Sequence, residues 1–477
     1  MRKRVEVFIV GAGPTGLGAA WRLSHYDHRD WLLCEAEPTA GGLAGSVVDK
    51  CGFTWDYGGH VQFSHYEYFE QLMDELLGPE GWLFHQRESW VWLRNTFVPY
   101  PFQLNLHHLP SHERDACLDG LKQVVQSQNA PPPANFAEWI NQSFGEGIAR
   151  VFLRPYNFKV WAYPPELLAW HWVGDRVARV DLDRVVTNIR LGRDDVSWGP
   201  NTQFRFPRQG GTGIIWQTLA RRLEQRHPGR LHFGCRLVRL DTERHTAFFA
   251  DGIEIEYQTL LSTIPLDVLV RLSDVAAGFT SALVDLRYSS THLFGIGLYG
   301  RPPEQLLGKC WLYFPEGNCP FYRVTHFSHY SPQNVPDARC FWSLMAEVSE
   351  SPMKPVDARA VSTDIIQGLL NTRLIPNREA IHHIWYHRLE HGYPTPSLHR
   401  DRALAALLPA LEERAVYSRG RFGAWKYEVS NQDHSFAQGV EFVDRWHTGA
   451  AEETFYQPER VNARRPTPLK VRTGTKT

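Results

Sequence analysis

Three glycines near the start of the sequence have the spacing that lets a backbone approach a phosphate group. Gly11, Gly13 and Gly16 directly follow the apolar run Val7–Val10, and Leu17–Leu23 has the pattern of a helix. In such a strand–turn–helix unit the first glycine allows a tight turn. The second leaves room for a pyrophosphate, and the third lets the helix pack on the strand. The N–H groups of the first helical turn then face the phosphates, so the pattern predicts a dinucleotide site.

An acidic residue ends the next predicted strand, at the place where dinucleotide-binding folds carry a ribose ligand. Trp31–Cys34 has the composition of a buried strand, and Glu35 follows it. A carboxylate here can accept hydrogen bonds from the ribose hydroxyls, although an ordinary surface glutamate at a strand end would look the same. The order strand, turn, helix, strand favours the ribose role.

Two further glycine pairs bear on the type of cofactor. Gly41 and Gly42 offer another close approach of the backbone, which favours FAD over NAD. Gly58 and Gly59 precede His60 and make a bendable loop that could lie against a flavin ring. The same three residues could equally form a turn with a structural histidine, and their spacing does not decide between the two.

The composition is that of a globular protein with more than one structural region. The chain has 477 residues, 43% hydrophobic and 22% charged, and single cores rarely exceed roughly 250–300 residues. A net charge of -1 argues against nucleic-acid or acidic-membrane partners but leaves room for a small anion held by local arginines. Seven widely spaced cysteines without a C-x-x-C pair predict no metal site and fit a reducing, cytoplasmic location.

The order of patterns along the chain predicts an α/β fold with a Rossmann-like FAD-binding domain built from discontinuous segments. We expect this domain to comprise residues 1–105, 204–285 and 400–455. A mainly helical substrate domain with mobile loops should occupy 106–203, and an antiparallel β-sheet domain should occupy 286–399. The tail, 456–477, contains several Lys, Arg and Pro residues and is expected to be partly disordered.

Nine stretches, in order along the chain, resemble the eukaryotic-type UDP-galactopyranose mutases found in fungi and parasites. They are Gly58–Tyr66, Val98–Gln103, Arg154–Trp161, Trp198–Asn201, Phe204–Pro207, Lys309–Pro315, Asn318–Arg323, His391–Pro396 and Gly420–Tyr427. One such match could be chance, but nine in register are specific.

The resemblance implies an isomerase that interconverts UDP-galactopyranose and UDP-galactofuranose without net redox change. In this family N5 of reduced FAD attacks the anomeric carbon and expels UDP. A flavin–sugar iminium then forms, the sugar ring opens, and it recloses through another hydroxyl. NADPH or NADH must first reduce the flavin. A covalent intermediate of this kind divides one difficult step into two easier ones.

The resemblance also implies roles for individual residues. The expected catalytic residues are Gly59, His60, Arg176 and Arg323. The expected cofactor-binding residues are Gly11, Gly13, Thr15, Gly16, Glu35, Gly41, Gly42, Gly58, Gly59, Arg421, Asn431 and Gln432. The expected substrate-binding residues are Tyr100, Gln103, Phe152, Asn157, Trp161, Arg176, Asn201, Trp311, Tyr313, Arg323, Tyr330, Tyr393 and Tyr427. Several of these aromatic residues could instead be ordinary core residues, and no metal is expected.

Two departures and two rival functions remain. Val180 and Asp181 replace a small residue and a proline expected in fungal forms, and an insertion is missing between Pro336 and Phe341. Relatives use that insertion in subunit contacts, so a homo-oligomer is possible but its form is open. The main rival function is an FAD-dependent oxidoreductase of the amine-oxidase type, which shares the fold but needs no pyrophosphate clamp. A non-catalytic UDP-sugar binder is the other, although a mere binder has no use for FAD.

Overall fold

A computed structural model describes residues 2–127, 131–178, 180–196, 202–464, 466, 467 and 469. The first of its two seven-stranded sheets has the strand order β10-β11-β12-β1-β2-β9, and β18 also pairs with β12. The strands are β1 Arg2–Val10, β2 Trp31–Cys34, β9 Leu231–His232, β10 Leu237–Asp241, β11 Thr246–Phe249, β12 Glu254–Ser262 and β18 Val416–Ser418. β1, β2, β9, β12 and β18 run parallel, which gives the predicted α/β class with a Rossmann-like sheet.

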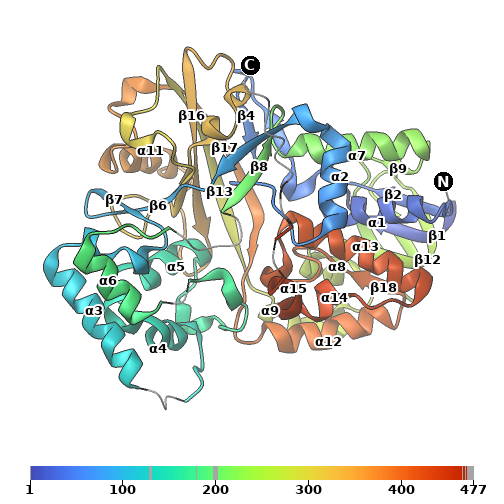
Figure 1. Cartoon of the computed structure of the whole chain (residues 1–477). Helices are drawn as coiled ribbons and strands as arrows, with labels where there is room; N and C mark the ends of the chain where they lie inside the picture. The colour runs from blue at the N-terminus through green and yellow to red at the C-terminus, as the bar shows by residue number, and fades with distance from the viewer. Residues whose placement is uncertain are drawn as a thin grey trace.

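Helices cover both faces of this sheet (Figure 1). α1 (Pro14–His25), α2 (Glu67–Leu77), α7 (Gly213–Arg226) and α13 (Gln432–Thr448) share one apolar core with Val7 and Ile9 of β1. α8 (Leu266–Leu272) and α12 (Arg400–Glu412) share a second core with Phe8 and Val10 on the other face. The alternation along β1 is that of a strand buried on both sides.

α1 and α13 lie in close contact although they come from opposite ends of the chain. A Cβ added to Gly18 would meet the Phe436 carbonyl oxygen at 2.5 Å, and one added to Gly439 would meet that of Thr15 at 1.9 Å. The helix backbones therefore touch at glycines, and α13 stands directly beside the first glycine-rich turn.

The second sheet has the order β17-β13-β16-β15-β14-β6-β7. Its strands are β6 Ser89–Leu93, β7 Thr96–Pro99, β13 Tyr288–Tyr299, β14 Trp311–Tyr313, β15 Arg323–Thr325, β16 Phe341–Glu350 and β17 Ile381–Pro394. The pairings within the predicted β-sheet region 286–399 are antiparallel, and β14 also pairs in parallel with β6, which lies outside that region. β6 and β7 also belong to this sheet, not to the first, although the sequence assigned them to the FAD-binding region.

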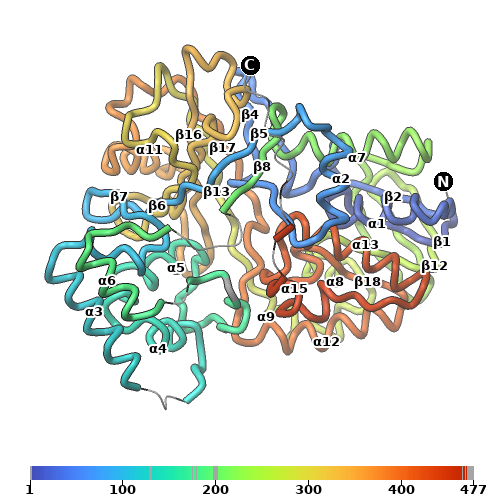
Figure 2. The backbone as a smooth tube through the Cα atoms, in the orientation of Figure 1, coloured from blue at the N-terminus to red at the C-terminus, as the bar shows by residue number. Residues whose placement is uncertain are grey.

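The segment of the chain between β7 and β8 is mainly helical. They are α3 Ser111–Gln126, α4 Phe136–Ile148, the π-helical turn Ala149–Leu153, α5 Arg154–Trp161 and α6 Leu182–Leu191. β8 (Gln203–Pro207) then pairs with β5 (Trp82–Gln86). In Figure 2 these helices form the lower left of the molecule, below the second sheet and opposite the first.

The first part of the predicted tail is helical. α14 (Glu453–Tyr456) and α15 (Pro458–Asn462) fold back along the protein, and Asn462 contacts both Glu428 and Arg176. No helix in the described ranges is both long and apolar enough to cross a membrane.

Candidate active site

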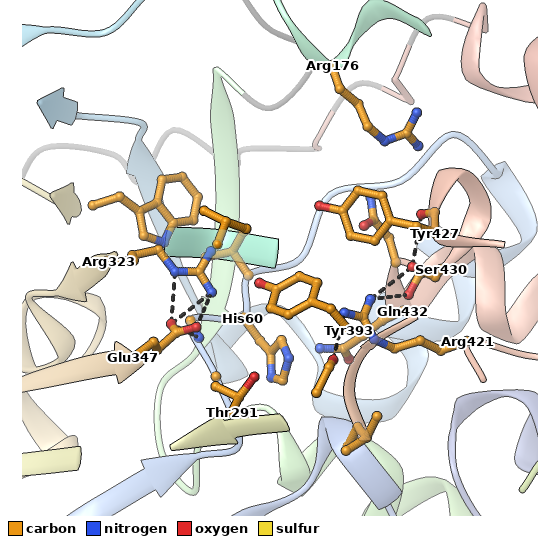
Figure 3. Close-up of a pocket in the computed structure, with 18 of the residues that line it drawn as sticks. His60, Arg176, Thr291, Arg323, Glu347, Tyr393, Arg421, Tyr427, Ser430 and Gln432 are labelled. Atoms are coloured by element: carbon orange, nitrogen blue, oxygen red, sulfur yellow. Dashed lines mark hydrogen bonds and ion pairs between the residues drawn. The ribbon is translucent and has the colours of Figure 1, made fainter. Parts of the chain in front are cut away.

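A cavity of about 480 Å³ lies where the two sheets and the helical region meet. One wall consists of the loop Gly58–His60 and the residues at the start of α13. Another wall comes from α5 and Arg176, and a third from β14, β15 and β16 of the second sheet. Figure 3 shows arginines and tyrosines from these separate elements turned toward a common space.

The glycine-rich turn leads toward this cavity and leaves a space that a dinucleotide would fit. Gly11 has φ +106°, and a Cβ added to Gly16 would lie 1.9 Å from the Gly11 carbonyl oxygen. Both positions therefore need glycine for the fold itself. Gly13 differs, because its φ is -77° and an added Cβ would meet only the Gly41 oxygen, at 3.9 Å. The protein itself does not require a glycine at 13, so the open space there is what a ligand close to the backbone would use.

Glu35 and the second glycine pair border the same turn. The Glu35 carboxylate accepts N–H hydrogen bonds from Ala12 at 2.6 Å and from Glu37 at 2.8 Å. Gly41 has φ +127°, and its N–H donates to the Ala12 carbonyl. These bonds hold the strand end, the turn and the Gly41–Gly42 segment together, as expected for one binding surface.

The start of α13 carries hydrogen-bonding groups toward the cavity. The Gln432 amide oxygen accepts from Gln62 and Trp216, both at 2.9 Å. Its Nε2 is buried and has no hydrogen-bond partner among the described residues. Arg421 donates to the Ser430 hydroxyl at 2.8 Å (Figure 3). A buried amide donor without a partner is costly unless a ligand accepts its bond, so this end of the cavity also fits a cofactor.

A fixed ion pair occupies the wall formed by the second sheet. Arg323 on β15 lies opposite Glu347 on β16 in the sheet register and donates to both carboxylate oxygens at 2.8 Å. Glu347 also accepts from the Gly59 N–H at 3.2 Å and from the Tyr322 hydroxyl at 2.6 Å. Burial alone would lower the pKa of Arg323, but Glu347 and nearby phenols raise it well above its usual value. The guanidinium therefore stays charged and points in a fixed direction.

Phenol side chains cover the space around this ion pair. Tyr100 and Tyr156 both pack against Tyr313, with ring centroids 5.4 and 5.5 Å apart. Tyr393 and Tyr427 lie 5.9 Å from each other. Burial raises the pKa of Tyr100, Tyr313 and Tyr393. These hydroxyls therefore remain protonated at neutral pH and can donate hydrogen bonds to an anion without adding charge.

Arg176 approaches the cavity from the opposite side (Figure 3). It ends the short 3-10 turn Gly174–Arg176 and donates to the Asn462 side chain at 3.0 Å and to the Glu428 carbonyl. Its guanidinium also lies 6.0 Å from the Tyr427 ring centroid. The C-terminal helix thus helps to hold this arginine at the rim.

The structure brings most, but not all, of the predicted substrate residues to the cavity. Tyr100, Asn157, Trp161, Arg176, Trp311, Tyr313, Arg323, Tyr393 and Tyr427 line it. Three others lie outside its lining. Gln103 is buried and donates to the Ala178 carbonyl, Phe152 stacks behind Tyr156, and Tyr330 packs against Phe206 and Trp311. Asn201 and the Trp198–Asn201 stretch lie outside the described residues.

Several cavity residues were not predicted from the sequence. They are Arg87, Tyr156, Tyr322 and Glu347. For Glu347 a signal did exist, because a carboxylate in the middle of the mainly apolar strand Phe341–Glu350 must be paired if it is buried. Tyr156 and Tyr322 lie within the matched stretches Arg154–Trp161 and Asn318–Arg323, which could have pointed to them, whereas no feature of the sequence separates Arg87 from an ordinary surface residue.

His60 is neutral in the folded protein. Burial, together with the charges of Arg421 and Arg323, lowers the pKa of its imidazole to about 3. An unfolded histidine has a pKa of about 6.5. As the pH falls from about 6.5 toward 3, this side chain is therefore protonated in the unfolded chain but not in the folded protein. Stability is therefore lost across this window.

We expect the pH dependence of stability to reveal this burial. Between pH 7 and pH 5 the free energy of unfolding of the wild type should fall by up to about 2 kcal/mol more than that of His60→Gln. Urea denaturation followed by tryptophan fluorescence at both pH values measures the difference. His171→Gln, which removes an exposed ring, should behave like the wild type, and identical curves for His60→Gln and the wild type would contradict the assignment.

Comparison with known proteins finds similar sequences and structures. A family profile described as "Flavin containing amine oxidoreductase" matches residues 14–291. A crystal structure of a reduced UDP-galactopyranose mutase superposes with a TM-score of 0.93 at 48% sequence identity, covering 97% of this chain and 98% of the other. A putative protoporphyrinogen oxidase from Exiguobacterium sp. reaches a TM-score of 0.71 at 16% identity, covering 94% and 99%. Putrescine oxidase bound to putrescine reaches 0.60 at 15% identity, also covering 94% and 99%. The last two likenesses concern the fold alone.

Proposed function

Because the chain belongs to the flavin-containing amine oxidoreductase family, and within it to the UDP-galactopyranose mutases, we propose that it interconverts UDP-galactopyranose and UDP-galactofuranose. The observation that carries the proposal is the joint presence of a dinucleotide-binding turn and a cavity walled by fixed arginines and neutral phenols. We further propose that the chain falls with the eukaryotic-type mutases, on the nine matching stretches of its sequence.

FAD would be held by the glycine turn after β1, by Glu35, by the Gly41–Gly42 segment and by Arg421, Asn431 and Gln432 near the start of α13. In its reduced form it supplies an electron-rich nitrogen that can act as a nucleophile. Gly59 and His60 would lie against its reactive edge. The Gly59 N–H is bound by Glu347, so the same carboxylate orients this loop and the guanidinium of Arg323.

The substrate's pyrophosphate requires cations, and Arg323 and Arg176 supply them from two sides. The guanidinium geometry pairs with phosphate oxygens through two parallel donors. Tyr313, Tyr393 and Tyr427 can donate further hydrogen bonds without charge, so that the nucleotide is restrained when its bond to the sugar breaks. Trp161 and Asn157, on α5, are placed to contact the uridine.

A rival oxidoreductase activity has less support. The family profile includes amine oxidoreductases, but an amine substrate has no need of two arginines and a row of phenol donors. The proposed reaction is redox-neutral, so NADPH or NADH would serve only to reduce the flavin beforehand. We propose that the helical region and the second sheet together form the substrate side.

The test uses flavin-loaded protein and UDP-galactofuranose. After reduction with dithionite, we expect conversion to UDP-galactopyranose, measured by anion-exchange chromatography, and no conversion by the same protein with oxidised flavin. Reduced protein that leaves the sugar unchanged, together with oxidised protein whose flavin becomes reduced as it oxidises an amine, would favour the rival.

A further inference from the structure

Two histidines and an aspartate meet at the surface of the helical region, away from the cavity. The 3-10 turn η4 (Leu106–His108) carries His107 and His108, and Asp194 lies after α6. Both Nε2 atoms lie within hydrogen-bonding distance of the same Asp194 oxygen, at 2.9 Å for His107 and 2.7 Å for His108. Their ligand atoms all lie within 4.8 Å of one another. Three donor atoms of metal-binding type therefore converge on one point.

Buried hydrogen bonds fix the backbone that carries these side chains. Asn105 is buried and accepts from the Asp195 N–H at 2.8 Å, and its amide donates back to the Asp195 carbonyl at 2.9 Å. Asn188 donates to the Leu104 carbonyl at 3.1 Å. The residues flanking the three ligands are thus joined before any ligand arrives, which reduces the ordering cost of binding.

The charged residues on either side of Asp194 in the sequence, Arg193 and Asp195, already have other partners. Arg193 donates to the Asn188 side chain, and Arg184 forms an ion pair with Asp195. The side chains of His108 and Asp194 are 29% and 49% exposed, so an ion could enter directly from solution and water could complete its coordination.

We propose that His107, His108 and Asp194 form a binding site for a divalent transition-metal ion of the Zn²⁺ class. Two imidazole nitrogens and one carboxylate oxygen suit Zn²⁺, Ni²⁺ or Cu²⁺, whereas Mg²⁺ and Ca²⁺ prefer oxygen ligands alone. A tetrahedral ion with bonds of about 2.0–2.1 Å needs its donors about 3.3 Å apart. The distances from the Asp194 oxygen to the His107 and His108 nitrogens, now 2.9 and 2.7 Å, would each need to grow by only about half an ångström. The bound ion would join η4 to the segment after α6.

Two other clusters in the described part of the chain lack these features. Asp49, Cys51 and His383 also approach one another, but the Asp49 carboxylate already accepts from the Cys51 N–H and the Trp55 indole, both at 2.8 Å. His65 and Asp433 line the cavity already described. The Asp49 cluster therefore provides a matched control. It also contains a histidine, His383, but its carboxylate already accepts hydrogen bonds from other groups.

The experiment measures zinc binding to the flavin-loaded, full-length protein after EDTA treatment and desalting. Calorimetric titration with ZnCl₂ should show a site in the wild type that His107→Gln/His108→Gln lacks, and Asp194→Asn should weaken it by at least roughly tenfold. Zn²⁺ should raise the Tm of the wild type but not that of the double variant, and MgCl₂ should have no effect on either.

The His383→Gln variant should bind Zn²⁺ like the wild type, which would show that the Asp49 cluster is not the site that is measured. Equal zinc stoichiometry and affinity in the wild type and the double variant would overturn the proposal. So would a Zn²⁺-dependent rise in Tm that survives loss of both histidines. Because the readouts are binding and stability, the result is independent of the mutase activity.

Discussion

Gly13→Ala should give a protein that folds normally without flavin but binds FAD roughly 10- to 100-fold more weakly, because forcing a methyl group into a packed contact costs about 1–3 kcal/mol. The backbone at residue 13 suits any amino acid, with φ -77°, and the protein atom nearest to an added Cβ is 3.9 Å away. The added methyl group would clash only with a ligand that lies against the backbone at this position. Flavin fluorescence quenching on titration of the apoprotein measures the affinity, and urea denaturation measures apoprotein stability.

Gly16→Ala is the matched comparison, because the two glycines belong to one motif. There an added Cβ would stand 1.9 Å from the Gly11 carbonyl oxygen, so α1 must move away from the turn and the apoprotein itself should be destabilised. If Gly13→Ala bound FAD as tightly as the wild type, the cofactor could not run along this turn as proposed.

Arg323→Ala should weaken UDP binding by at least roughly 10- to 100-fold, since a hydrogen bond between charged partners contributes about 1.5–3 kcal/mol. The substitution also leaves Glu347 buried without its cation, and a lone carboxylate in the cavity would repel the diphosphate. Calorimetric titration with UDP, using the reduced flavin-loaded protein, gives the change in affinity.

Arg388→Ala controls for the loss of an arginine on the same sheet. Arg388 on β17 pairs with Glu350, the last residue of β16, much as Arg323 pairs with Glu347. It does not line the cavity, so UDP affinity should stay close to that of the wild type. Equal UDP affinity in Arg323→Ala and Arg388→Ala would remove Arg323 from the proposed clamp.

The parts of the fold that depend on local sequence were predicted well. The first strand, the glycine turn and α1 follow one another within the first 25 residues, and each has its own local pattern. The pairing of β6 with β14 was not predictable from local sequence. It joins Ser89–Val91 to Trp311–Tyr313, which lie far apart in the sequence.

The same distinction applies to the candidate site. Tyr313, Arg323, Tyr393 and Tyr427 were found through short motifs, and the structure places all four at the cavity. Tyr330 lies outside the nine matched stretches, and its ring packs against Phe206 and Trp311. Which way a ring faces depends on the packing of a short helix against distant strands, and a motif does not carry that information.

The contact between α1 and α13 affects how this protein must be made. The glycine turn emerges from the ribosome first, yet the helix that closes over it begins only at Gln432, after the second sheet and the helical region have been synthesised. Until α13 has been synthesised, the face of α1 that packs against α13 therefore stays exposed in the nascent chain. With the proposed cofactor site, the flavin would be bound only after α13 has been synthesised, and a chain that ends before α13 would hold it poorly.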